Sequence, residues 1–288
     1  MQAIARVAPR ANDAYVQAIA AGDPLFERHE ITTPLRMAHF LAQALHETGG
    51  LRMLRENMRY SEQRLLEVFG VNRHTAAITP SEAARLAGRP EEIAERVYGQ
   101  GNPRKASELG NTQPGDGFRY RGNGLLQTTG RGNHRRIGNA SGIDLEGNPD
   151  LATAPEHALK PALQVWSVGK LNDAADRNDI SAIARHINGG LNGLASRERW
   201  LYKLWPLLRG AGAPATPWEA AEEDARIKWL QRALNDLGAQ PRLAVDGRYG
   251  PATRRAVRAF QRAAGIPVDG VAGPVTVEAI KLRLGAIR

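Results

Sequence analysis

The sequence predicts a mainly α-helical protein of two domains, and three observations lead to this prediction. Apolar residues recur at helical spacing, for example at Ala38, Leu41 and Leu45. A segment rich in Gly, Asn, Asp and Thr, residues 99–142, interrupts the helical pattern and predicts loops. A motif repeated near the carboxyl end predicts a second, smaller helical unit.

The expected helices of the first domain have recognisable beginnings. A helix is expected to begin at Pro34, because proline suits the first helical position and the hydroxyl side chains of Thr32 and Thr33 precede it. Ser61 is a cap candidate for the next helix. The expected helices after Pro34 cover 61–69, 80–87, 91–98, 156–171, 179–187 and 196–208. Within the loop-rich segment we expect a short strand around Leu125–Thr128, and such an insert is often where a binding site lies.

The character of the sequence changes near residue 210. The stretch RGAGAPATPWEAAEE lacks periodicity, which predicts a linker over 210–221 between domains at 1–209 and 222–288. In the second domain, VDGRYGPATRRAV (245–257) and VDGVAGPVTVEAI (268–280) repeat each other at an offset of 23 residues. Each copy is an Asp-Gly turn followed by a Gly-Pro helix entry, with LQRAL or FQRAA ahead of it. This pattern predicts a small three-helix bundle.

The composition narrows the chemistry. The sequence has no cysteine, which excludes disulfides, thiol catalysis and cysteine-ligated zinc. Its net charge of +9 favours anionic partners such as nucleic acid, anionic lipid or a cell-wall polymer. The basic residues are scattered rather than gathered in one tract with aromatics, so we expect no nucleic-acid site. No apolar run approaches the roughly 20 residues of a membrane span, and the first residues lack the apolar block of a secretion signal.

The stretch FLAQALHETGGLRMLRENMRYS, residues 40–61, carries two carboxylates in contrasting settings. Glu47 lies in the last turn of an apolar helix, where the helix dipole disfavours a negative charge. Glu56 lies between Arg55 and Arg59, with Arg52 nearby, and positive neighbours keep a carboxylate ionised. Hydrolysis of a glycosidic bond needs one protonated and one ionised carboxyl group. The residues therefore permit Glu47 as acid and Glu56 as base, although two solvated surface glutamates remain the alternative.

Four stretches follow one another in the order found in glycoside hydrolase family 19. They are LAQALHETGGL, ENMRYSEQRLLEVF, GDGFRYRGNGLLQTTGRGNHRRIG and INGGLNGLASRERWLYKL, and they cover roughly 30–208. The chain most resembles the short, loop-poor bacterial and phage branch of that family, the lysozyme-like endolysins. Residues 225–285 resemble a peptidoglycan-binding module of the three-helix type, with its repeated D-G-x-x-G-P-x-T motif. The resemblance implies a lysozyme-like helical catalytic domain with a small, loop-rich active-site segment.

The resemblance also implies an inverting mechanism, with Glu47 as the general acid and Glu56 as the general base. For inversion, the two carboxyl groups should lie roughly 6.5–9.5 Å apart. The positions that match substrate-binding or water-positioning residues of the family are Tyr60, Gln127, Thr129, Asn133, Asn188 and Arg199. We assign Arg199, rather than Arg197, as the arginine that interacts electrostatically with Glu47 and Glu56. No cofactor and no metal are implied.

Three positions depart from the family pattern. Asn123 stands where the family usually has Arg, and His134 replaces an aromatic residue. Thr129 stands where plant relatives have Ser, which keeps the hydroxyl. The changes at Asn123 and His134 leave the sugar preference open.

The function implied is that of an endolysin that hydrolyses the β-1,4 bond between N-acetylmuramic acid and N-acetylglucosamine. We expect a monomer that binds peptidoglycan through both domains and does not span a membrane. It would accumulate in the host cytoplasm and reach the wall through a holin-type pore.

Several alternatives stay open at this point. The cleft motifs suit a chitinase equally well, and a lytic transglycosylase would need Glu47 alone. A non-catalytic wall-binding protein is a third possibility, against which the presence of both glutamates argues. A zinc peptidase fits poorly, because HETGG has no second histidine at the position that the H-E-x-x-H motif requires.

Overall fold

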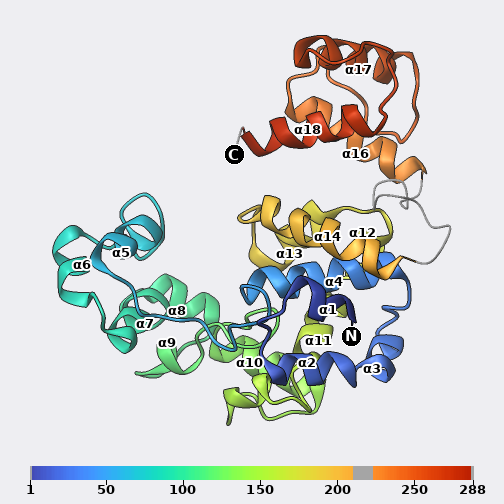
Figure 1. The fold of residues 1–288 in the computed structure, drawn as a ribbon. Helices are drawn as coiled ribbons and strands as arrows, with labels where there is room; N and C mark the ends of the chain where they lie inside the picture. Colours follow the sequence, from blue (N-terminus) through green and yellow to red (C-terminus); the bar gives the residue numbers. More distant parts are fainter. Residues whose placement is uncertain (1, 210–222, 287–288) are drawn as a thin grey trace. The chain divides into compact units, whose positions relative to one another are not determined.

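The computed structural model describes residues 2–209 and 223–286, and these residues are mainly helical, as the sequence predicts (Figure 1). The predicted linker, 210–221, lies outside the described residues. The helices before it are α1 (Gln2–Val7), α2 (Asp13–Ala20), α3 (Asp23–Arg28), α4 (Pro34–Glu47), α5 (Glu62–Phe69), α6 (Pro80–Leu86), α7 (Pro90–Tyr98), α8 (Pro103–Leu109), α9 (Asp116–Arg119), α10 (Arg131–Ser141), the 3-10 helix η1 (Pro149–Thr153), α11 (Leu159–Val168), α12 (Leu171–Asp176), α13 (Ile180–Asn188) and α14 (Leu194–Leu208). Those after it are α16 (Glu223–Asp236), α17 (Pro251–Ala264) and α18 (Pro274–Ala286).

The helix beginnings expected at Pro34 and Ser61 are confirmed. Helix α4 begins at Pro34. Ser61 caps α5, since its side chain accepts a hydrogen bond from the backbone N–H of Arg64. Thr79 caps α6 in a capping box with Glu82, which satisfies two backbone donors at once. The helix expected over 156–171 is shorter in the structure, where α11 covers Leu159–Val168.

The prediction of loops over 99–142 is wrong in part, because this segment contains α8, α9 and α10. Asn102 caps α8, and Gly110 ends it in the left-handed conformation that glycine tolerates. The many Gly and Asn residues of this segment therefore mark helix ends rather than one continuous loop.

The strand expected around Leu125–Thr128 is also not formed. Asn123 and Thr128 instead exchange two backbone hydrogen bonds, of 3.1 and 2.8 Å, which close a tight turn. Asn123 also bridges to Arg55. Within the described ranges, extended pairing is limited to such isolated bridges.

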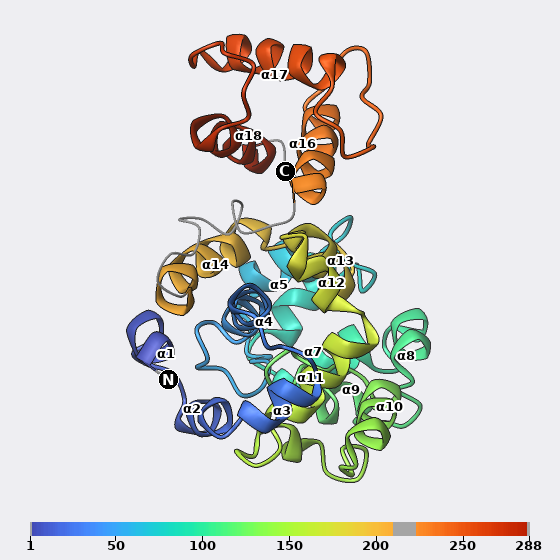
Figure 2. The same ribbon diagram turned by 90° about the vertical axis from the view of Figure 1, so that its right-hand side faces the viewer.

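The chain divides into two compact units, one of residues 1–33 and 40–172 and the other of 34–39 and 173–288. In the first unit, α7 packs against α9, and the two helices lie side by side in both views (Figures 1 and 2). One apolar core of this unit joins α5, α6 and α7 through buried side chains such as Leu65, Leu86 and Ile93. Packing of these helices fixes the position of Tyr98, which ends α7.

In the second unit, α16, α17 and α18 enclose an apolar core with Leu230, Leu234, Val257, Phe260 and Ile280 at its centre. This arrangement confirms the small three-helix bundle that the repeat predicts. Along the described parts of the chain, no helix combines the length and apolarity that crossing a bilayer would need.

The two copies of the repeat are each held by one buried glutamine. The Gln231 amide N–H donates to Asp246 Oδ1, to the carbonyl of Arg248 and to Thr253 Oγ1, at 2.8, 3.1 and 3.2 Å. Its Oε1 accepts a hydrogen bond of 3.0 Å from the N–H of Gly247.

Gln261 does the same in the second copy. Its amide donates to Asp269 Oδ1, the carbonyl of Val271 and Thr276 Oγ1 at 2.7, 3.0 and 2.9 Å, and it accepts from the N–H of Gly270 at 2.9 Å. The shared Asp, Gly and Thr of the motif are therefore fold-determining residues, because they satisfy the buried amide.

Candidate active site

Glu47 is the last residue of α4 and is half-buried. The chain reverses directly after it through Gly49, Gly50 and Leu51, which have φ of 59, 85 and 59°. This left-handed conformation is easy for glycine and explains the Gly-Gly pair. The fully buried Thr48 fixes the turn, because its hydroxyl donates to the carbonyl of Ala44 at 2.5 Å and accepts from the N–H of Leu51 at 2.8 Å. The break that the sequence predicts after Glu47 is confirmed.

Glu56 receives a hydrogen bond on each carboxylate oxygen. The hydroxyl of Tyr98 donates to Oε1 at 3.0 Å, and the backbone N–H of Gly122 donates to Oε2 at 3.3 Å. The backbone N–H of Glu56 in turn donates to the carbonyl of Gly122 at 2.7 Å. Glu56 is thus fixed between the end of α7 and the segment that follows α9.

The prediction that neighbouring arginines determine the charge of Glu56 is wrong. Burial is the largest influence and raises the pKa of Glu56, while the hydrogen bonds from Tyr98 and Gly122 and the charge of Arg121 oppose it. Arg55 instead forms an ion pair with Asp150 at 2.5 Å, and Arg52 donates to the carbonyl of Gly49 at 2.8 Å. Local arginines are therefore not what sets the protonation of this carboxyl group.

The turn at 123–128 places Gln127 beside Glu56. Gln127 has a φ of 49°, and its side-chain amide donates to the carbonyl of Gly124 at 2.8 Å. A Cβ added to Gly122 would lie 2.8 Å from Gln127 Oε1 and 3.4 Å from Glu56 Oε2. Both side chains therefore lie against the same face of Gly122, which only glycine leaves open. The structure brings these two predicted site residues together.

Thr129 and Asn133 continue from Gln127 in a chain of hydrogen bonds. The hydroxyl of Thr129 donates to the carbonyl of Gln127 at 3.1 Å, and Asn133 Nδ2 donates to the carbonyl of Thr129 at 2.8 Å. Three of the predicted polar site residues are thus connected through the beginning of α10.

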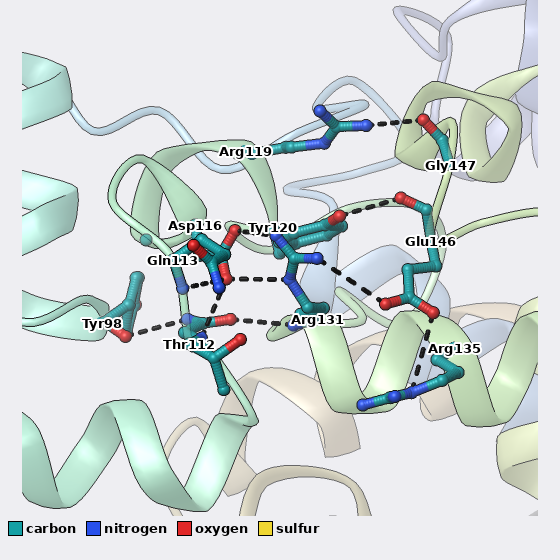
Figure 3. A network of polar contacts seen from close by, with 12 residues as sticks. Tyr98, Thr112, Gln113, Asp116, Arg119, Tyr120, Arg131, Arg135, Glu146 and Gly147 are labelled. Carbon is teal, nitrogen blue, oxygen red and sulfur yellow. Dashed lines mark hydrogen bonds and ion pairs between the residues drawn. The ribbon is translucent and has the colours of Figure 1, made fainter.

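A network of polar contacts around Asp116 and Arg131 supports this region (Figure 3). The carboxylate of Asp116, 2% exposed, accepts hydrogen bonds of 2.8 and 2.6 Å from the guanidinium of Arg131. It also accepts from the N–H groups of Thr112 and Gln113, both at 2.9 Å. Burial alone would raise the pKa of Asp116, but the Arg131 guanidinium and these N–H groups together lower it. Figure 3 shows Arg131 lying between Asp116 and Glu146.

Asn111 joins this network to Tyr98. Its Nδ2 donates to the carbonyl of Tyr98 at 2.8 Å, and its Oδ1 accepts from the N–H of Arg131 at 2.8 Å. The beginning of α10 and the tyrosine that contacts Glu56 are therefore held by one side chain. The sequence interpretation missed Tyr98, Asn111, Asp116 and Arg131, and the only signal for them was their position in or next to the loop-rich segment.

Tyr60 lies partly in the core rather than free in solution. Its ring packs edge-on against Phe69, with ring centroids 5.2 Å apart. Burial, and then the charge of Glu56, raise the pKa of Tyr60. The charge of Glu56 therefore affects the pKa of Tyr60, while the ring of Tyr60 contributes to packing.

Asn188 and Arg199 belong to the second unit, so their roles stay predictions. Asn188 is exposed at the end of α13, where its Nδ2 donates to the carbonyl of Asn192 at 3.3 Å. Arg199 is exposed on α14, whereas Arg197 on the same helix is fully buried.

Two of the three departures from the family pattern, Asn123 and His134, are core residues. Asn123 is 3% exposed and donates through Nδ2 to the carbonyl of Pro149 at 2.5 Å. His134 is fully buried against the ring of Tyr120, at 5.2 Å between centroids, and burial lowers its pKa. Both substitutions therefore act on packing beneath the site.

Comparison with known proteins gives the class and then the family. The chain is 34% identical over 194 residues to a "Glycosyl hydrolase family 19 domain-containing protein" of Haemophilus influenzae, an alignment that covers 67% of this chain and 88% of the relative. The protein is therefore a glycosidase. It belongs to glycoside hydrolase family 19.

The carboxyl-terminal part matches a separate family. Residues 223–280 match the family described as "Putative peptidoglycan binding domain". Over 55 residues, 19% of this chain and 22% of the relative, the chain is 51% identical to the "Zinc D-Ala-D-Ala carboxypeptidase" of Streptomyces albus G. Among solved structures, a bacterial family 19 chitinase aligns with a TM-score of 0.47 at 22% identity, over 75% of this chain and 97% of that one. By its sequence relatives, the protein combines a family 19 hydrolase with a carboxyl-terminal domain that matches the peptidoglycan-binding family.

Proposed function

We propose that the protein is an endolysin that hydrolyses the β-1,4 bond between N-acetylmuramic acid and N-acetylglucosamine in peptidoglycan, with inversion. The observation that carries the proposal is the presence of a peptidoglycan-binding domain in the same chain as a family 19 hydrolase. Such a domain raises the concentration of the enzyme at the wall, whose glycan strands are β-1,4-linked.

In the proposed mechanism, Glu56 is the general base. Its two oxygens both accept hydrogen bonds, from Tyr98 and Gly122, which suits the ionised carboxylate because that form only accepts. Burial raises the pKa of Glu56 toward the working pH, and a carboxylate with a raised pKa is a stronger base once it is deprotonated.

The other residues take the remaining roles. Glu47 donates a proton to the leaving oxygen, while Glu56 removes a proton from a water molecule that attacks the anomeric carbon from the opposite face. The side chains of Gln127, Thr129 and Asn133 bind the sugar and that water. Support for this assignment comes from the shared position of Glu56 and Gln127 at Gly122.

Mass spectrometry of digested sacculi tests the proposal. We expect fragments with N-acetylmuramic acid at a reducing end, which define a muramidase. Anhydro-muramic acid would instead identify a transglycosylase, and free stem peptide would identify an amidase or peptidase. Cleavage of chitin oligomers with no release from sacculi would identify a chitinase. Any of these three results would overturn the proposal.

The variant Glu56→Gln separates a two-carboxylate hydrolase from a transglycosylase. General base catalysis contributes about 10²–10⁴-fold, so we expect turnover to fall by that factor. The amide keeps the size of the side chain, and circular dichroism checks that the variant folds. Lysis at the wild-type rate would contradict a role for Glu56 as base.

We also propose that the enzyme acts from the host cytoplasm and reaches the wall through a holin-type pore, as an endolysin does. Expression in a bacterial host with and without a pore-forming holin tests this. We expect lysis only when the pore is present, and lysis in its absence would overturn this proposal.

A further inference from the structure

The carboxyl-terminal bundle contains a pocket of about 590 Å³. The end of α16 and the segment after it form one side, α17 forms the other, and one residue of α18 completes the rim. Its lining residues are Leu234, Leu237, Gly238, Ala239, Gln240, Pro241, Leu243, Ala252, Arg255, Ala256, Ala259, Phe260, Ala263 and Arg283.

The lining combines small apolar groups with positive charge. Helix α17 contributes Ala252, Ala256, Ala259 and Ala263, which recur at helical spacing and so share one face. Leucine side chains face them from the other side. Two arginines, Arg255 and Arg283, belong to the lining, and no aspartate or glutamate does. The pocket therefore favours a ligand with small apolar groups and negative charge.

The aromatic content of the lining argues against a sugar ring as the main ligand. A sugar binds well to an exposed aromatic face, and Phe260 is the only aromatic residue of the lining. Phe260 is 8% exposed, and the guanidinium of Arg283 lies 5.6 Å from its ring centroid. That ring face is covered, so it offers no stacking surface.

The repeated motif does not offer a second site of this kind. Its Asp, Gly and Thr side chains and backbone are occupied by the buried amides of Gln231 and Gln261. The pocket uses other residues and is a concave surface of the bundle on which a wall component can bind.

We propose that this pocket binds the carboxylate-bearing peptide stem of peptidoglycan rather than its glycan strand. The stem contains alanine, glutamate and a diamino acid that carries an extra carboxylate, so its methyl groups match the alanine wall and its free carboxylates match the two arginines. The inference deepens the proposed function, since it names the part of the wall that the binding domain recognises.

Calorimetry with the full-length protein tests the inference. The probes are a synthetic stem tetrapeptide, L-Ala-γ-D-Glu-meso-diaminopimelate-D-Ala, and chitotetraose as a neutral glycan. We expect Arg255→Gln to weaken peptide binding about tenfold, which corresponds to the loss of one charge-assisted hydrogen bond. Ala259→Leu, which fills the pocket, should weaken it as well.

Arg254→Gln is the matched control, because it removes the same charge from the neighbouring exposed residue of α17 outside the lining. We expect it to keep wild-type affinity for the peptide. An equal loss of peptide affinity in Arg255→Gln and Arg254→Gln would show that overall charge attracts the peptide. This result would overturn the pocket as the binding site. No peptide binding, or unchanged peptide binding in Arg255→Gln and Ala259→Leu, would also overturn it.

The outcome is independent of the hydrolytic reaction. The tetrapeptide contains no glycosidic bond, so its binding is measured without turnover. The product analysis can fail to show a muramidase while the peptide still binds to the pocket. Conversely, the products can be those of a muramidase while the peptide does not bind.

Discussion

Tyr98 stands out at the scale of single residues, because it connects the end of a helix to one oxygen of Glu56. Its hydroxyl donates to the carboxylate, which stabilises the charged form of Glu56 and opposes the effect of burial. The same contact raises the pKa of Tyr98 well above its usual range, together with burial, which is the larger cause. The hydrogen bond therefore acts on both groups, because it opposes the rise in the pKa of Glu56 and adds to the rise in the pKa of Tyr98.

Removing this hydroxyl should change the pH dependence of catalysis. In Tyr98→Phe the charged form of Glu56 loses a donor, so the pKa of Glu56 rises further. If Glu56 is the base, activity appears as the pH rises through that pKa. The acid limb of the profile should therefore move upward by roughly one pH unit, the size expected for one hydrogen bond to a charge. Rates measured from pH 4 to 9 on soluble glycan fragments give the limb.

Tyr120→Phe is the control for this prediction. It also removes one tyrosine hydroxyl in the first unit, which donates to the carbonyl of Glu146 at 2.8 Å, but it does not contact Glu56. Both variants can lose stability, and only Tyr98→Phe should move the acid limb. An unmoved limb in Tyr98→Phe would mean that this contact does not tune Glu56.

At this scale the sequence predicted the helix end at Glu47 but misjudged the surroundings of Glu56. The turn after Glu47 depends on adjacent residues, so local pattern was enough. The contacts of Glu56 come from Tyr98, 42 positions away, and Gly122, 66 positions away, and burial depends on the whole fold. Neighbouring arginines in the sequence were a poor guide, because side chains of extended segments point away from one another.

At the scale of elements, the segment from 111 to 133 shows why loops and helices were confused. Its short helices are held by the Asp116–Arg131 contacts more than by helix propensity, since α9 has four residues. Sequence pattern detects long amphipathic helices well, as for α4 and α14, and misses helices that a polar network stabilises.

Substitution of Asp116 should test this network. Asp116→Ala removes the acceptor of two N–H groups and of Arg131, and leaving such groups without a partner costs about 3 kcal/mol of folding free energy. The start of α10 should shift, so turnover should fall as well. Urea unfolding and turnover on soluble fragments measure both effects.

Glu108→Ala is a suitable comparison for Asp116→Ala. Its ion pairs with Arg104 and Lys105 are exposed to solvent and should contribute little to stability. Equal effects of the two substitutions would show that burial of the Asp116 contacts does not matter.

The repeat of the binding domain gives a second prediction for elements. In Gln261→Ala, the N–H of Gly270 and the groups around Asp269 lose their buried partner, which should cost roughly 1–3 kcal/mol of the stability of this domain. Arg262→Ala changes the adjacent exposed residue and should have little effect. The repeat was visible in the sequence, but the two glutamines that hold it were not recognised, because their role depends on contacts 8 to 22 positions away.

At the scale of the whole molecule, positive charge is concentrated toward the carboxyl end. Residues 223–288 carry twelve Lys and Arg against six Asp and Glu, which is most of the net charge of +9. We expect this charge to attract the anionic wall, and attraction between exposed charges weakens with salt, since the Debye length falls from about 10 Å at 0.1 M to about 3 Å at 1 M.

Deleting residues 215–288 should therefore change binding and salt dependence together. The full-length protein should lyse sacculi more slowly as salt rises from 0.05 to about 0.3 M, whereas the shortened protein should lyse them slowly at all salt concentrations. Turnover on soluble glycan fragments should be similar for both, because these fragments need no capture at the wall. Co-sedimentation with sacculi and turbidity loss at several salt concentrations measure these effects. If the shortened protein keeps full affinity for sacculi, or keeps the same salt dependence, then the catalytic part alone provides the attraction to the wall.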